Sequence, residues 1–187
     1  MADVAVIGER TFLFEKIFKE SQLDALFISP GILGSPFLPK IKMIIVPAGF
    51  ANPEYSDILP ALIRSRSNIA TFVENGGVLT VFGPLVPKHM YDWLPLHIEY
   101  IHEYFTSDLS AASDDECSCL VSQESAYCDG YLLPGKDLNP VFTDSKGRAV
   151  LVSGNYGRGV LVITSIHEFP QSKYLRWGAE KGMPARI

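Results

Sequence analysis

The sequence predicts an α/β fold: a three-layer α/β/α sandwich whose sheet is mostly parallel and carries an antiparallel extension. Three observations predict it. Short apolar runs rich in β-branched residues are bounded by Gly or Pro, and in the first half they alternate with helical patterns, as in βαβ units. In the second half, β-like runs follow one another without such helices. With 187 residues, 47% of them hydrophobic, and no repeat or linker, the chain is expected to form a single domain over residues 1–187.

The first half is expected to alternate strands with helices. The segment "RTFLFEKIFKE" (10–20) places its large apolar residues near one face of a short helix. Ser56 or Asp57 can cap a longer helix that runs to about Glu74, where Asn75-Gly76-Gly77 ends it. Strands are expected at residues 3–7, 25–29, 42–47 and 78–82.

The second half is expected to be mainly β. Residues 96–105, "LHIEYIHEYF", alternate apolar and polar side chains as a half-exposed strand does. An acidic, Ser-rich surface loop, "SDLSAASDDECS", follows it. The tail "QSKYLRWGAEKG" is expected to form a closing helix that stops at Gly182. Further strands are expected at residues 126–133, 149–153 and 160–165, the last two joined through a "GNYGRG" hairpin turn.

In this interpretation the first half is flavodoxin-like, and ligands in such sheets sit beyond the carboxyl ends of the strands. Glu9 and Arg10 follow the first strand, where they would orient a polar ligand or form a structural pair. The loop after the third strand offers the amide, carboxylate and phenol of Asn52, Glu54 and Tyr55. These groups suit a hydroxyl-rich ligand such as a sugar, and equally the capping and turn chemistry of a loop. The same rule selects the loop 29–31 after the second strand, Gly83 after the fourth strand, and His167 and Glu168 after the last.

Three segments resemble the class I glutamine amidotransferase-like superfamily, in particular its trehalose-utilisation-like (ThuA-like) branch. "MIIVPAGFANPEY" is similar to the strand and "PGG"-like turn of those proteins. "FVENGGVLTVFG" is similar to their helix, Gly-Gly turn and strand, and "GNYGRGVLVITSIHEFP" to the terminal hairpin that ends in the family's His. The resemblance spans residues 2–170 and implies the same α/β/α fold.

The resemblance implies a catalytic role for His167, but two departures from the family pattern bear on it. Catalytic members carry a Cys on a strand-to-helix elbow written G-x-C-x-G, and their His is followed two residues later by a Glu. Here the elbow reads Phe82-Gly83-Pro84-Leu85, which offers no nucleophile, and Pro84 has no N–H to donate to an oxyanion. Glu168 is adjacent to His167, so an extended backbone would point the two side chains in opposite directions.

Composition excludes several classes of partner. Lys+Arg total 16 against 21 Asp+Glu, and no basic block exists, so nucleic acid is not expected to bind. The apolar run "VAVIG" is too short for a signal peptide or a membrane span.

Three cysteines fit a reducing, cytoplasmic compartment. The C-x-C pair at 117–119, with Cys128 and His97 or His102, has poor spacing for zinc, so neither a metal nor a cofactor is expected.

The preferred hypothesis is a non-catalytic amidotransferase-like domain, a pseudoenzyme that binds a small molecule such as a sugar or contacts another subunit. The alternative is a hydrolase or isomerase that acts on a small carbohydrate-like substrate and uses His167 with Glu9 or Glu54 as acid/base groups. Aromatic residues gather in "MYDWLPLHIEYIHEYF". They would belong to the core or, if exposed, to a homo-oligomer or partner surface.

Overall fold

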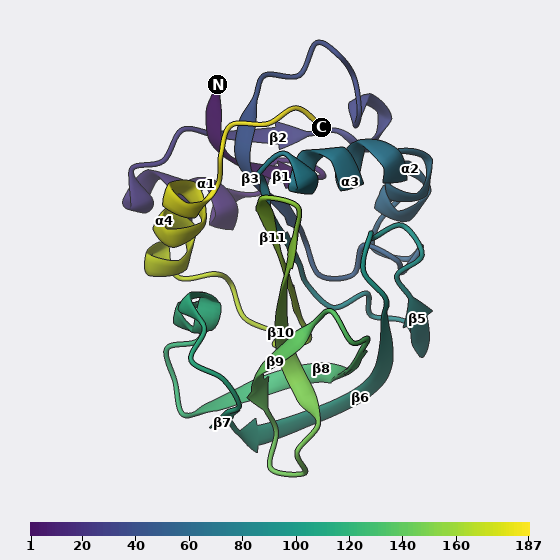
Figure 1. The fold of residues 1–187 in the computed structure, drawn as a ribbon, viewed down its shortest axis with the longest axis vertical. Coiled ribbons are helices and arrows are strands. Elements are labelled where there is room, and N and C mark those ends of the chain that lie inside the picture. The colour runs from purple at the N-terminus through teal and green to yellow at the C-terminus, as the bar shows by residue number, and fades with distance from the viewer.

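Five parallel strands form one half of an 11-stranded sheet in the computed structural model, which describes all residues 1–187 (Figure 1). Each of these strands was expected from its apolar run. Their spatial order is β2-β1-β3-β4-β11. The strands are β1 (Ala2–Ile7), β2 (Ala25–Ile28), β3 (Ile41–Val46), β4 (Val78–Val81) and β11 (Gly159–Thr164).

Helices cover both faces of the parallel strands (Figure 1). Helices α1 (Phe12–Ser21) and α4 (Ser172–Lys181) pack on one face, and α2 (Ile58–Arg64) and α3 (Arg66–Glu74) on the other. Alternate residues of each strand divide between two apolar clusters: Val4 and Val6 join the α1/α4 cluster, and Ala5 and Ile7 join the α2/α3 cluster. This is why the strands are continuously apolar.

The other half of the sheet is antiparallel, and it lies below the parallel strands in Figure 1. Six strand pairings are antiparallel and four are parallel, so the prediction of a mostly parallel, flavodoxin-like sheet is corrected to a mixed sheet. Strands joined by short turns return antiparallel beside their predecessors, and further antiparallel pairings join strands that are not consecutive in the chain. These strands are β5 (Lys88–Met90), β6 (Ile98–Asp108), β7 (Ser110–Ala111), β8 (Ser125–Pro134), β9 (Asn139–Thr143) and β10 (Ala149–Tyr156).

Two local expectations were wrong in detail. The helix expected up to Glu74 breaks at Ser65, whose hydroxyl donates to the Leu33 carbonyl at 3.1 Å, just past the short 3₁₀ helix η1 (Pro30–Ile32). The acidic segment after β6 is only partly a surface loop. It contains β7 and a 3₁₀ helix, η2 (Glu116–Leu120), in which Cys117 is buried.

The two turns that the glycines indicated are confirmed. Gly76, with φ 107°, follows the end of α3. In the hairpin, Tyr156 pairs with Gly159 around a two-residue turn in which Gly157 has φ 60°. Helix α4 ends at Lys181, with Gly182 as its C-cap. No helix is long and apolar enough to cross a membrane.

Candidate functional site

The segment after β11 carries His167 to the carboxyl edge of the sheet and fastens it to β8. Ile166 forms an isolated bridge with Cys128, and the backbone N–H of His167 donates to the Tyr127 carbonyl at 2.8 Å. The backbone N–H of Asp129 donates to the Ser165 carbonyl, also at 2.8 Å. These bonds place the His167 and Asp129 side chains beside each other.

His167 and Asp129 form a pair in which the carboxylate is buried and the imidazole is accessible. Nδ1 of His167 lies 3.0 Å from both carboxylate oxygens and is hydrogen bonded to Oδ2. The Asp129 side chain is 0% exposed and that of His167 is 49% exposed. Oδ1 of Asp129 has no hydrogen-bond partner. When the proton is on Nδ1, Nε2 is an acceptor, and it has no hydrogen-bond partner within the chain.

The strand-end turn Phe82-Gly83-Pro84-Leu85 runs alongside this pair. A Cβ added at Gly83 would lie 3.3 Å from Oδ2 of Asp129. Leu85 has φ 55°, which a non-glycine residue rarely adopts, and its carbonyl accepts from Asn52 Nδ2 at 3.0 Å. The turn leads into strand β5, so no helix begins there to aim its N–H groups at a developing oxyanion.

None of the three cysteines supplies an activated thiol to this turn. Cys117 and Cys128 are buried, and Cys119 is half-buried. Burial, followed by the Asp129 carboxylate, raises the pKa of Cys128 to about 12. Burial also raises the pKa of the Cys117 and Cys119 thiols. A thiolate nucleophile requires the opposite environment, with nearby positive charge.

Aromatic residues of β6 surround the pair from the antiparallel side. The ring of Tyr104 lies 6.2 Å from that of His167, and burial together with Asp129 raises the pKa of its phenol. The hydroxyl of Tyr100 donates to the Asp129 carbonyl at 2.7 Å and lies 3.0 Å from Nδ1 of His102. Sequence reasoning missed Asp129 and Tyr104. The one available signal was an acidic residue inside the otherwise uncharged strand "AYCDGYLL".

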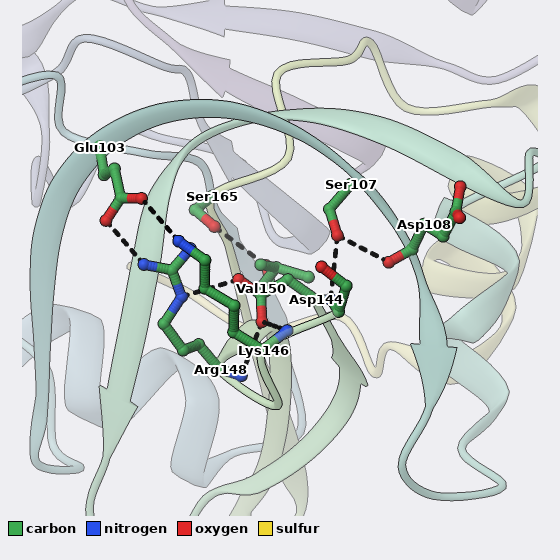
Figure 2. Close-up of polar contacts among 9 residues, drawn as sticks. Glu103, Ser107, Asp108, Asp144, Lys146, Arg148, Val150 and Ser165 are labelled. Carbon is green, nitrogen blue, oxygen red and sulfur yellow. Dashed lines mark hydrogen bonds and ion pairs between the residues drawn. The ribbon is translucent and has the colours of Figure 1, made fainter.

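Arg148 is the centre of a polar network in the antiparallel half of the sheet, and Figure 2 shows its contacts with Glu103 and Asp144. The Arg148 guanidinium bonds Glu103 at 2.6 Å and Asp144 at 2.7 Å, and its Cζ lies 4.7 Å from the centre of the Phe105 ring and 4.5 Å from that of Tyr131. These residues join β6, β8 and the turn between β9 and β10. Ser165, two residues before His167, donates its N–H to the nearby Val150 carbonyl at 2.9 Å.

A cavity of about 190 Å³ opens beside His167. It lies between α1, the ends of β3 and β4, and the segment that follows β11. Its lining is mostly apolar, and its only charged side chain is that of Glu168. The residues that line it are Phe14, Pro47, Ala48, Phe82, Ile166, His167, Glu168, Phe169 and Pro170.

The other residues selected from the sequence lie outside that cavity lining. Glu9 is exposed, and the ion pair of Arg10 is with Glu15 at 3.0 Å instead of with Glu9. Asn52 forms a turn, because its Oδ1 accepts from the Glu54 N–H at 3.0 Å while its Nδ2 binds the Leu85 carbonyl. Glu54 and Tyr55 are exposed.

The carboxylate partner of His167 is one that the sequence analysis did not name. No hydrogen bond or ion pair joins His167 to Glu9, Glu54 or Glu168, and its carboxylate partner is Asp129. The physical reason is strand pairing: the segment after β11 lies against β8, whose Asp129 therefore faces the imidazole.

No family model and no curated protein sequence matches the chain. Solved structures do match it. A putative GMP synthase component from Thermoplasma acidophilum aligns with a TM-score of 0.61 and 11% identity, covering 94% of this chain and 90% of that one. A glutamine amidotransferase from Thermotoga maritima aligns with a TM-score of 0.58 and 15% identity, covering 88% of this chain and 74% of that one.

A β-galactosidase from Rahnella sp. R3 also aligns, with a TM-score of 0.59 and 14% identity over 96% of this chain. The chain spans only 31% of the length of that enzyme. At such identities the likeness concerns the fold. The chain therefore has an α/β fold similar to the folds of these proteins, one of which is a glutamine amidotransferase.

Proposed function

We propose that this chain is a non-catalytic amidotransferase-like domain of the ThuA-like branch that binds a small ligand in the cavity beside His167. The observation that carries the proposal is the strand-end turn. Gly83 lies beside the His167–Asp129 pair, and it has no side chain. A Cβ at position 83 would be in tight contact with the Asp129 carboxylate. Covalent catalysis from this turn has no reactive atom to use.

The cavity gives the proposal its binding site. It combines apolar walls with two polar side chains, His167 and Glu168, at one edge. Small-ligand sites commonly have this composition, in which apolar area supplies affinity and a few polar groups fix orientation. A sugar or another small polar molecule is the class of ligand we favour, and binding to a second protein chain is a further role of the same domain.

A second candidate function is favoured by the geometry of the His167–Asp129 pair. A buried carboxylate that orients an imidazole whose Nε2 is free is the arrangement of a general base. Such a base would activate water or move a substrate proton, as in a hydrolase or an isomerase. In this candidate Asp129 takes the place that the sequence had offered to Glu9 or Glu54.

A thermal-shift series with a panel of sugars and other small polar molecules tests the proposal. Ligand binding raises the melting temperature in proportion to the logarithm of ligand concentration over its dissociation constant. We expect at least one class to stabilise the wild type, and His167→Ala to weaken that binding about tenfold or more.

His97→Ala is the matched control, because His97 is exposed and lies outside the cavity. It should bind as the wild type does. A panel without any stabilising member, or one whose shifts are unaffected by His167→Ala, overturns the proposal. Turnover of a bound ligand, detected by NMR and lost in His167→Ala, selects the second candidate.

The remaining proposals concern the cellular location of the protein, its domain organisation and its oligomer surface. We place the protein in the cytoplasm on the strength of its three free cysteines. We also treat residues 1–187 as one domain. Exposed Tyr104 and Tyr127, both near His167 along neighbouring strands, are the candidate surface for a homo-oligomer.

A further inference from the structure

Aromatic rings form much of the wall of the cavity beside His167. Phe14 comes from α1, Phe82 from the end of β4 and Phe169 from the segment after β11. Phe14 and Phe169 meet edge to face, with ring centres 5.4 Å apart. The faces of such rings carry partial negative charge, and the hydrocarbon around them keeps water away.

The lining of the cavity holds a carboxylate and, apart from the His167 imidazole, no basic side chain. Glu168 is half-buried and is the only Asp, Glu, Lys or Arg among the lining residues. Behind His167 lies the buried Asp129 carboxylate, whose Oδ1 has no hydrogen-bond partner. Arg10, on the loop before α1, is already paired with Glu15 and lies over the Phe27 ring. No lysine or arginine of the lining neutralises these carboxylates.

We propose that the cavity binds a small organic cation, such as an ammonium group carrying methyl or methylene substituents. This inference rests on the proposed function, because it names the ligand class of the same site. A cation on the face of an aromatic ring is attracted by the ring quadrupole, and desolvation strengthens that attraction. Glu168 adds a carboxylate at the edge of the cavity.

The size of the cavity agrees with such a ligand. A dry cavity of about 150 Å³ holds a benzene molecule in another protein. The cavity here is somewhat larger, about 190 Å³, and accommodates a trimethylammonium group with a short chain.

The same features disfavour the other ligand classes. An anion would face Glu168 without a lysine or arginine in the lining to pair with it. A neutral sugar would bring several hydroxyl groups to a wall that offers two polar side chains, His167 and Glu168. The inference therefore narrows the sugar class to sugars that carry an amine.

A matched pair of probes tests the charge alone. Choline and 3,3-dimethylbutan-1-ol have nearly the same shape, and only choline is charged. Titration calorimetry on the full chain at low salt should show choline binding about tenfold more tightly than the alcohol. Added salt should weaken the binding of choline and leave that of the alcohol unchanged.

Matched variants locate the effect. Glu168→Gln should reduce the preference for choline while the alcohol still binds as before. Glu124→Gln removes the same charge from an exposed residue outside the cavity lining and should leave the preference unchanged. Phe169→Leu should weaken the binding of choline more than that of the alcohol, and the 46% exposure of Phe169 makes this variant tolerable to the fold.

Equal binding of the two probes, or a preference that neither Glu168→Gln nor Phe169→Leu reduces, overturns the organic-cation inference. Binding of neutral sugars without binding of choline also overturns it and leaves the proposed function standing. If no probe and no member of the ligand panel binds, the proposed function and the inference fall together.

Discussion

His167 and Asp129, 38 positions apart in the chain, meet with Nδ1 of the imidazole 3.0 Å from the carboxylate. The contact depends on the pairing of the segment after β11 with β8. It gives the domain an oriented imidazole at the carboxyl edge of its sheet, although the adjacent turn carries no nucleophile.

A double-mutant cycle on His167→Ala and Asp129→Asn measures this contact. We expect His167→Ala alone to lower the free energy of unfolding by about 1 kcal/mol, because it leaves the buried carboxylate without its hydrogen bond. The coupling energy should be about 0.5–3 kcal/mol, as for residues in direct contact. Urea denaturation of the four proteins supplies the values, and strictly additive effects would contradict the contact.

The cysteines provide a test of the absence of an activated thiol. In the native protein at about pH 8, iodoacetamide should modify Cys119 slowly and leave Cys117 and Cys128 unmodified, since burial raises all three pKa values. Unfolding in guanidinium chloride should expose all three to reaction. Mass spectrometry identifies the sites. Rapid labelling of Cys128 in the native protein would show an activated thiol beside Asp129. That result would contradict the proposed non-catalytic role.

Replacing Arg148 by lysine should destabilise the fold, although the positive charge is kept. Lysine cannot bond Glu103 and Asp144 through a planar fork while it stacks between Phe105 and Tyr131. We expect Arg148→Lys to lower the free energy of unfolding by about 1–3 kcal/mol. Lys146→Arg, at a neighbouring side chain that is 67% exposed, is the control and should be nearly neutral. Equal stability of the two variants would show that the network contributes little.

Acid should weaken the same network. The hydrogen bond from Arg148 lowers the pKa of Glu103. Burial would raise the pKa of Asp144, but the hydrogen bonds from Arg148 and from the Lys146 backbone, with the charge of Arg148, together lower it. A carboxyl whose folded pKa is depressed contributes stability above its unfolded pKa, and that stability is lost as the pH falls through the folded value. Stability should therefore decline below the ordinary glutamate value of 4.5.

Glu103→Gln should make this decline shallower, whereas Glu124→Gln, at an exposed residue with no ion pair, should not change it. Urea midpoints measured between about pH 7 and pH 3 provide the comparison. A wild type and a Glu103→Gln variant with parallel pH profiles would contradict the assignment.

The organisation of the chain followed from local patterns. The apolar runs that became β1, β3, β4 and β11 were visible in the sequence, because a strand buried on both faces must be continuously apolar. Gly76 and Gly157 marked their turns because both adopt a positive φ. The break at Ser65 was not visible, since it depends on a carbonyl at Leu33 that only the fold brings near.

The sequence by itself determined the α/β class, the strand that delivers His167, and the residues Phe82-Gly83-Pro84-Leu85 that deny the turn a nucleophile. These features depend on residue type and on the spacing of apolar side chains, which repeats every two residues in a strand and every 3.6 in a helix. Both can be recognised within a short segment of the sequence. Only the tertiary structure decided how far the antiparallel part of the sheet extends and that Asp129 is the hydrogen-bond partner of His167. Those outcomes depend on which strands lie side by side, and strand order is set by the packing of the whole chain.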